Sequence, residues 1–225
     1  SWIRGILSEH YGVPVDGVTY VTGGEESPGR SEKIKLDLPP SIRVERIGPT
    51  QTLARMLAEG EIDALYTARA PSSFRARDGR VRRLFADYGR VEREYYRNTG
   101  IFPIMHVVAL RRDVYEANRW IAQSLYKAFV AAQRYVYEDF HETAALKAML
   151  PWLVEHVEEA EALMGPDFWP YGLERNHATL ATFLRYSFEQ GLSRRLLAPE
   201  DLFAPETLDR LAGHTWPGNV RELEN

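Results

Sequence analysis

Residues 42–66 read IRVERIGPTQTLARMLAEGEIDALY, and they predict a strand, a helix and a second strand in quick succession. The apolar residues over 42–47 indicate the first strand, which a Gly-Pro pair ends. Thr50 can cap a helix, and Gly60 is its natural end. Residues 62–66 are predicted to form the second strand. Because the links between these elements are short, their order predicts a parallel βαβ unit and an α/β fold class.

Helices outnumber strands in the rest of the predicted secondary structure. Upstream, residues 2–11 predict a helix and residues 18–22 a strand, and an apolar run over 104–110 predicts a further strand. Four helices are then predicted, a long one reaching about residue 139 and three more over 142–149, 151–163 and 176–190. The C-terminal half is therefore predicted to be mostly helical.

Composition excludes several classes of protein. The chain has 225 residues and 44% hydrophobic content, enough for one large domain or two small lobes. Its net charge is −4, so no overall field favours nucleic acid or an anionic membrane. It has no cysteine, which excludes disulfides and thiolate metal sites. No apolar run approaches the roughly 20 residues of a membrane span, and the sequence shows no secretory signal. We predict a cytoplasmic protein, or a periplasmic one if the binding-protein hypothesis given below holds.

Residues 75–97 hold eight arginines, interleaved with four acidic residues. An anion-collecting or RNA-binding patch is one interpretation. No series of aromatic side chains accompanies the arginines, as a surface that stacks bases would need. We therefore predict a solvated surface with local ion pairs.

Three further stretches carry a family resemblance. Residues 95–112 read YYRNTGIFPIMHVVALRR, residues 70–72 read APS and residues 167–172 read DFWPYG. Together they resemble the 4,5-dihydroxyphthalate decarboxylase family, over about residues 2–208. That family is similar in fold to the type II periplasmic solute-binding proteins, in which two α/β lobes enclose a ligand.

The resemblance implies a division of the chain. Residues 1–103 would form the second lobe, residues 104–208 the returning strand and the C-terminal helices, and residues 209–225 an unrelated tail. The N-terminal part of the first lobe is predicted to be missing, which would expose apolar surface. Residues 216–225, WPGNVRELEN, instead resemble the end of the AAA+ domain of enhancer-binding transcription activators. The chain has no phosphate-binding Gly-rich loop, so this tail predicts no ATPase.

The family's activity implies a carboxy-lyase that converts 4,5-dihydroxyphthalate, or a close relative, to protocatechuate and CO2. Such a site needs cations for two carboxylates and a general acid beside the ring. Arg69 follows the predicted strand at 62–66, and ligands bind at the carboxyl ends of parallel strands, so Arg69 is the predicted clamp. Ser72 and Ser73 can donate hydrogen bonds to a carboxylate. His106 interrupts the apolar run at 104–110 and is the candidate for proton transfer, because an imidazole titrates near neutral pH.

Further candidate substrate contacts are Tyr96 and Thr99, just upstream of His106. Arg4 on the first predicted helix is another candidate, although a solvated arginine is the favoured interpretation there. Trp169 belongs to an aromatic corner that can either stack on a phenolic ring or anchor its loop to the core, and anchoring is favoured. No metal site and no cofactor are predicted. The expected partner is a small anionic aromatic molecule, with no nucleic acid and no membrane, and a homo-oligomer is left open.

A binding protein is the competing hypothesis. A non-catalytic protein of the ABC-transporter type that captures a small anionic aromatic compound would have the same fold and would be periplasmic, and fold alone cannot distinguish it from the enzyme.

Overall fold

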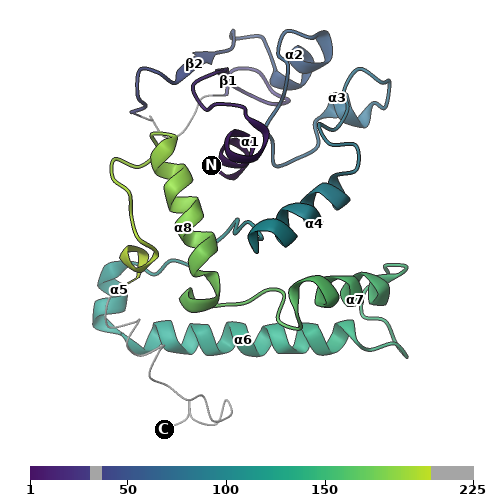
Figure 1. The fold of residues 1–225 in the computed structure, drawn as a ribbon, viewed down its shortest axis with the longest axis vertical. Coiled ribbons are helices and arrows are strands. Elements are labelled where there is room, and N and C mark those ends of the chain that lie inside the picture. The colour runs from purple at the N-terminus through teal and green to yellow at the C-terminus, as the bar shows by residue number, and fades with distance from the viewer. Residues whose placement is uncertain (31–36, 204–225) are drawn as a thin grey trace. The chain divides into compact units, whose positions relative to one another are not determined.

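The computed structural model describes residues 1–30 and 37–203 (Figure 1). It divides into two compact units. Among the described residues, the first unit comprises 1–30, 37–94 and 182–196, and the second comprises 95–181 and 197–203. The tail at 216–225 lies outside the described residues, and the assignment of residues 1–103 and 104–208 to parts of a two-lobed fold stays a prediction.

A small parallel sheet and short helices make up most of the first unit. The strands pair from Thr19 opposite Arg43 to Thr22 opposite Arg46. The elements are α1 (Trp2–Tyr11), β1 (Thr19–Thr22), β2 (Arg43–Arg46), α2 (Leu53–Glu59), α3 (Ser72–Arg75) and the start of α4 (Tyr88–Thr99). The fold is therefore a mixed α/β arrangement with few strands, which confirms the predicted class at this level.

Two glycines end the helices of the first unit where the sequence predicted. Gly12 ends α1 with φ 66°, and Gly60 ends α2 with φ 76°, both in the left-handed region that glycine adopts without strain. The predicted start of α2 was too early by two residues. Thr52 rather than Thr50 is the N-cap, and its side chain makes no capping hydrogen bond.

Two predicted strands do not form. Residues 62–66 lie in bends and irregular backbone, and residues 104–110 are likewise irregular. A strand needs a neighbour to pair its backbone groups, and in the described residues the one sheet contains β1 and β2 alone. The parallel pair is thus β1 with β2, and no βαβ unit completes at 62–66.

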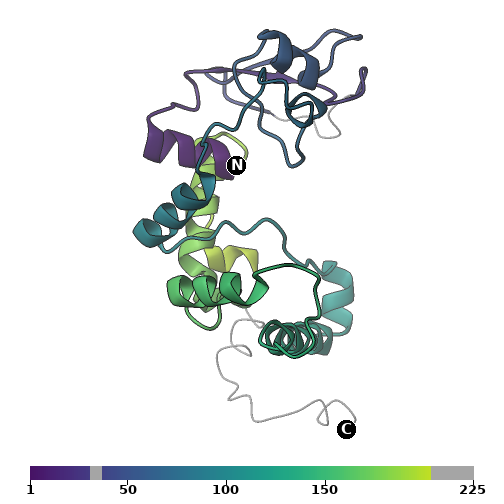
Figure 2. The same cartoon turned by 90° about the vertical axis from the view of Figure 1, so that its right-hand side faces the viewer.

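The core of the first unit forms where α1 packs against the C-terminal part of α8 (Leu173–Glu189) and the residue that follows it (Figure 1 and Figure 2). The Trp2 ring lies 5.6 Å from the Phe183 ring and meets the Tyr186 ring edge-on at 5.8 Å. Tyr186 is only 1% exposed. Gln190, fully buried, donates to the backbone oxygen of Ser1 at 2.9 Å, which fixes the N-terminus of α1 to the C-terminus of α8.

Glu9 makes this packing pH-dependent. Its carboxylate accepts hydrogen bonds from the Tyr186 hydroxyl and, at 2.7 Å, from the Arg185 guanidinium, and these bonds lower the pKa of Glu9 below its ordinary value near 4.5. A carboxyl whose pKa is lower in the folded state stabilises the fold above its unfolded pKa. That contribution disappears as the pH falls through the lowered value.

We therefore expect Glu9→Gln to unfold at a lower urea concentration than the wild type at pH 7. The difference should shrink below pH 4.5 and vanish once Glu9 is protonated in the folded wild type. Urea midpoints between pH 3 and pH 7 measure this, with Glu45→Gln on exposed β2 as the control. A difference of constant size across the whole range would rule the carboxylate out as its source.

The second unit is helical. It contains the end of α4, then α5 (Arg112–Ala117), α6 (Trp120–Phe140), α7 (Leu153–Met164), the first part of α8 (Leu173–Glu189) and a short 3₁₀ turn over Pro199–Leu202. The helices predicted at 151–163 and 176–190 are confirmed. The predicted long helix forms as α6, but Tyr115, which its pattern included, lies in the separate helix α5. Among the described residues, no helix is both long enough and apolar enough to cross a membrane.

The helix predicted over 142–149 is wrong. Those residues form bends and irregular backbone, and the side chains of Leu146 and Met149 are exposed. A helix this short is marginal unless its apolar side packs against something, and Pro151 prevents its extension.

Candidate functional site

Two adjacent glutamates hold the loop that carries Arg69. Glu26 accepts hydrogen bonds from the backbone nitrogen of Ser72 at 2.6 Å and from its hydroxyl at 2.7 Å. Glu25 accepts one from the hydroxyl of Thr67, which in turn accepts from the backbone nitrogen of Arg69 at 3.2 Å. The loop is therefore fixed on either side of Arg69, whose side chain is exposed.

The Glu26 anchor can be tested on its own. The Ser72 hydroxyl and backbone N–H lower the pKa of Glu26, so its carboxylate is charged at neutral pH. We expect Glu26→Ala to speed hydrogen exchange at the Ser72 amide roughly fivefold, the loss of about 1 kcal/mol. Hydrogen exchange measured by NMR reports this amide directly, and Glu92→Ala, an exposed site on α4, is the control. Equal exchange in wild type and Glu26→Ala would show that the hydrogen bond does not restrain the loop.

The two predicted serine donors differ in availability. Glu26 already occupies both donors of Ser72. The hydroxyl oxygen of Ser73 is buried and makes no hydrogen bond among the described residues. A buried hydroxyl without a partner is unfavourable, so Ser73 keeps an unused donor, but its oxygen is closed to solvent and Ser73 does not line the hollow described below.

His106 lies in the second unit, on the irregular segment that follows α4, and its side chain is exposed. Tyr96 and Thr99, the two predicted contact residues upstream of His106, make hydrogen bonds that stabilise the end of α4. The hydroxyl of Thr99 donates to the Tyr95 backbone oxygen at 2.8 Å, and the backbone oxygen of Tyr96 accepts from Gly100 at 2.7 Å. Nothing in these contacts assigns Tyr96 or Thr99 to a ligand.

The aromatic corner that contains Trp169 is anchored to α6, as the sequence favoured. The backbone nitrogen of Trp169 donates to the Tyr137 hydroxyl at 3.0 Å, and the Gln133 side chain donates to its backbone oxygen. The Trp169 ring itself is exposed and lies 5.4 Å from the Phe102 ring. The structure thus brings Trp169 against the segment that leads to His106.

Arg4 has a partner within the first unit. Its guanidinium lies over the Tyr20 ring of β1, 5.1 Å from the ring centre, and its side chain is half-buried. This cation–π contact joins α1 to the sheet. It is a structural contact and leaves the predicted substrate role untested.

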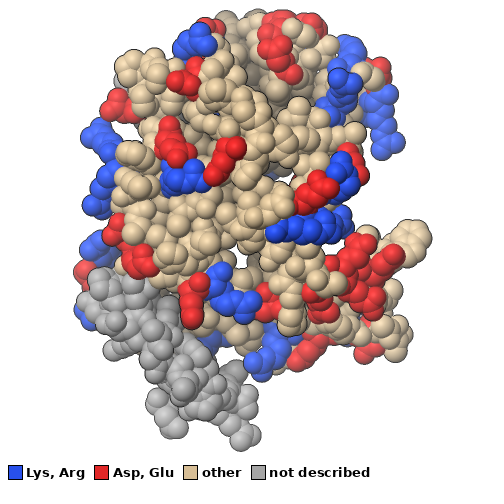
Figure 3. Space-filling view, viewed as in Figure 1, with Lys and Arg blue, Asp and Glu red and all other residues tan. Residues whose placement is uncertain are grey.

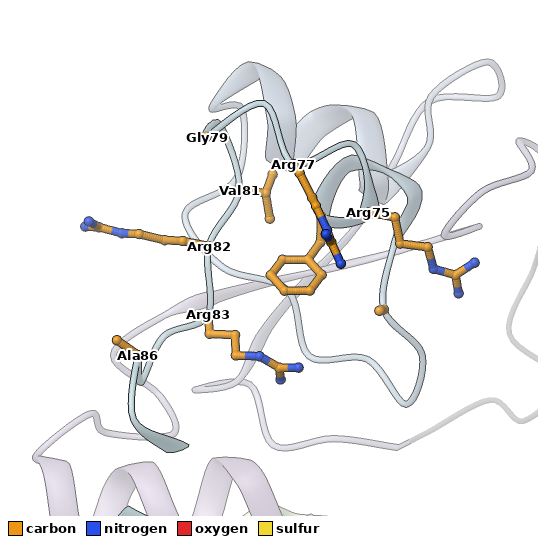
Figure 4. Close-up of a pocket in the computed structure, with 9 residues that line it drawn as sticks. Arg75, Arg77, Gly79, Val81, Arg82, Arg83 and Ala86 are labelled. Carbon is orange, nitrogen blue, oxygen red and sulfur yellow. The ribbon is translucent and has the colours of Figure 1, made fainter. Parts of the chain in front are cut away.

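The arginine-rich run only partly follows the prediction of a solvated surface. Arg80 pairs with Asp78 at 2.6 Å, and Arg90 pairs with Glu94 at 2.7 Å, as expected for local ion pairs. Figure 3, in the orientation of Figure 1, shows basic side chains gathered where α3 lies. Some of them surround a hollow of about 630 Å³, lined by Ala70, Phe74, Arg75, Arg77, Gly79, Val81, Arg82, Arg83 and Ala86 (Figure 4).

The hollow was not predicted, although the sequence carries a signal for it. Between residues 70 and 86 there are five arginines and one acidic residue, Asp78, a net charge of +4 in a chain whose total is −4. Because Asp78 is engaged by Arg80, the excess positive charge remains on the arginines around the hollow.

Comparison with known proteins finds two similar decarboxylases. A 4,5-dihydroxyphthalate decarboxylase from Comamonas testosteroni is 36% identical to the chain over 208 residues, which is 92% of the chain and 63% of that protein. The chain thus resembles the 4,5-dihydroxyphthalate decarboxylases over most of its own length. A second 4,5-dihydroxyphthalate decarboxylase, from Pseudomonas putida, is 43% identical over 96 residues, 43% of the chain and 37% of that protein. No family model matches the chain.

These similarities confirm the resemblance to the 4,5-dihydroxyphthalate decarboxylase family that the sequence indicated. The chain spans less than two thirds of the length of these two decarboxylases, 63% of one and 37% of the other. The loop with Arg69, the segment with His106 and the corner with Trp169 all fall in or beside the three stretches that indicated this resemblance.

Proposed function

We propose that the chain is a decarboxylase of a hydroxylated aromatic dicarboxylate, either 4,5-dihydroxyphthalate or a close relative. One observation carries the proposal, the 36% identity over 92% of the chain to a protein named for that reaction. The proposal includes a two-lobed fold of the type II periplasmic-binding-protein kind for the whole family, and it requires no diffusible organic cofactor.

The chemistry sets what the site must do. Direct loss of CO2 would leave a high-energy aryl carbanion. Protonation of the ring carbon that bears the carboxylate is easier, because the hydroxyl para to it donates electrons and loses its own proton. CO2 then departs, its bonding electrons restore the aromatic ring, and the phenol regains a proton. The net change replaces one carboxylate by one hydrogen.

Named residues can fill these roles. Arg69 lies in a loop fixed by Glu25 and Glu26, and its exposed planar guanidinium can hold a carboxylate through two parallel hydrogen bonds. His106 would deliver the proton to the ring carbon.

Two substrates test this proposal. Incubation with 4,5-dihydroxyphthalate should form protocatechuate over many turnovers. Chromatography measures the amount of protocatechuate formed. Phthalate has the same two carboxylates but no hydroxyl, so it should bind without losing CO2. Turnover of phthalate at a similar rate would contradict the ring-protonation route. If 4,5-dihydroxyphthalate raises the melting temperature with no product formed, the protein captures the compound and does not catalyse.

A further inference from the structure

The arginines around the hollow beside α3 lack counter-charges. Among residues 1–30 and 37–203, no carboxylate lies within ion-pairing distance of Arg77, Arg82 or Arg83. Asp78 is bound to Arg80, and Asp87 is bound to Arg90 at 3.3 Å. Like charges gathered in one hollow repel one another, and an anion bound there would relieve this repulsion.

Arg83 lies over two aromatic rings, an arrangement in which the N–H groups of its guanidinium can still bind an anion. Its terminal carbon lies 4.4 Å from the centre of the Tyr88 ring and 5.3 Å from the centre of the Phe74 ring. Contacts with ring faces use the faces of the guanidinium and leave its N–H groups pointing outward in the plane. Those N–H groups match the two oxygens of a carboxylate.

Arg77 has an unusual backbone. Its φ is 53°, in the left-handed region that an arginine seldom adopts. In Figure 4 the side chains of Arg77 and Arg83 extend into the hollow from different parts of the loop, whereas the side chain of Arg82 extends away from it. A residue kept in a sparsely populated conformation suggests that its side-chain position has a use.

We infer that this hollow binds an aromatic dicarboxylate, with one carboxylate on Arg77, the other on Arg83, and the ring near Phe74. The inference rests on the proposed function, because it assigns that function's substrate class to particular residues. It places the two carboxylates on Arg77 and Arg83 in the hollow, in place of the carboxylate contact proposed for Arg69, which directly precedes Ala70 in the lining.

The chemistry of the hollow favours this ligand over other anions. Two guanidiniums on separate parts of the loop suit an anion with two separate charges. Inorganic phosphate would satisfy the charge but would leave the Phe74 ring without a planar partner. A nucleic acid would need a series of aromatic platforms along a groove, and the lining contains one aromatic residue.

Binding of phthalate, measured by calorimetry on the whole chain, tests the inference. Phthalate keeps both carboxylates and has no hydroxyl to drive decarboxylation, so binding is separated from chemistry. Arg77→Gln and Arg83→Gln should each weaken binding roughly 10- to 100-fold, the loss of a charged hydrogen-bonded pair. Arg82→Gln removes the same charge from the same loop and should change affinity no more than about threefold. Benzoate should bind more weakly than phthalate, and phosphate more weakly still.

A second variant keeps the test independent of folding. Arg77→Gly relieves the left-handed backbone, so it should retain the wild-type melting temperature and still lose affinity for phthalate. Equal losses in the Arg82 and Arg83 variants, or phosphate binding as tightly as phthalate, would overturn the inference in favour of a general anion surface.

Turnover of 4,5-dihydroxyphthalate, measured in parallel, separates the two proposals. If the wild type turns over and Arg77→Gln and Arg83→Gln bind phthalate normally, the inference fails while the proposed function stands. If the wild type does not turn over but phthalate binding depends on both arginines, the inference stands and the proposed catalytic function fails.

Discussion

His106→Ala is expected to lower the rate of CO2 release from 4,5-dihydroxyphthalate by about 10²–10⁴-fold, the usual contribution of a positioned general acid. The KM should change little, because the imidazole is proposed to move a proton rather than to hold a carboxylate. Steady-state kinetics of protocatechuate formation measure both quantities. His156→Ala, which removes an exposed imidazole from α7 of the same unit, is the matched control.

Two outcomes would remove His106 from this role. A kcat within about threefold of the wild type would mean that another group, or water, supplies the proton. A raised KM with an unchanged kcat would assign the imidazole to ground-state binding.

Gly5→Ala is expected to destabilise the chain by about 1–3 kcal/mol, because it overfills the contact between α1 and α8. A methyl group at Gly5 would lie 2.3 Å from two carbon atoms of the Tyr186 ring. That ring is buried, meets Trp2 edge-on, and is fixed by its hydroxyl to Glu9, so it cannot move aside. The steric cost therefore exceeds the gain of up to about 1 kcal/mol that alanine brings to a helix. Urea unfolding measures the difference.

Gly89→Ala gives the control for this prediction. Gly89 also lies in a helix, α4, but a methyl group there would meet only the end of the flexible Arg93 side chain, at 3.0 Å. The free energy of unfolding of the Gly89→Ala variant should equal or exceed that of the wild type. Equal destabilisation by the two substitutions would mean that the contact with Tyr186 is not what excludes a side chain at Gly5.

Local signals in the sequence were sufficient to predict most of the helices and both strands of the sheet. Gly12 and Gly60 ended α1 and α2 because a left-handed C-cap is set by the glycine itself. The failure at 104–110 has a non-local cause. Met105 and Val107 are 71% and 76% exposed, so an apolar run typical of a core strand has no sheet to join in the described residues. Whether such a run pairs depends on distant segments, which its own composition does not report.

The candidate site shows the same division. Arg69 was predicted from its place after a strand at 62–66, which does not form. The anchor of its loop joins Ser72 to Glu26 across 46 residues of sequence, which no local pattern reveals. The positive charge of the hollow remains because Asp78 pairs with Arg80 and not with the arginines that line the hollow. The hollow was missed because the interleaved charges suggested ion pairs along the whole run. The anchoring of the Trp169 corner was predicted correctly, because a dense aromatic cluster commonly packs on a helix.

The number of CO2 molecules released per chain tests the central claim most directly. With 4,5-dihydroxyphthalate labelled with ¹³C in both carboxyl groups, the purified chain should release many equivalents of ¹³CO2, each matched by one protocatechuate, at a rate proportional to chain concentration. Release of less than one equivalent, together with a ligand-induced rise in melting temperature, would contradict a decarboxylase and identify a protein that only captures the compound.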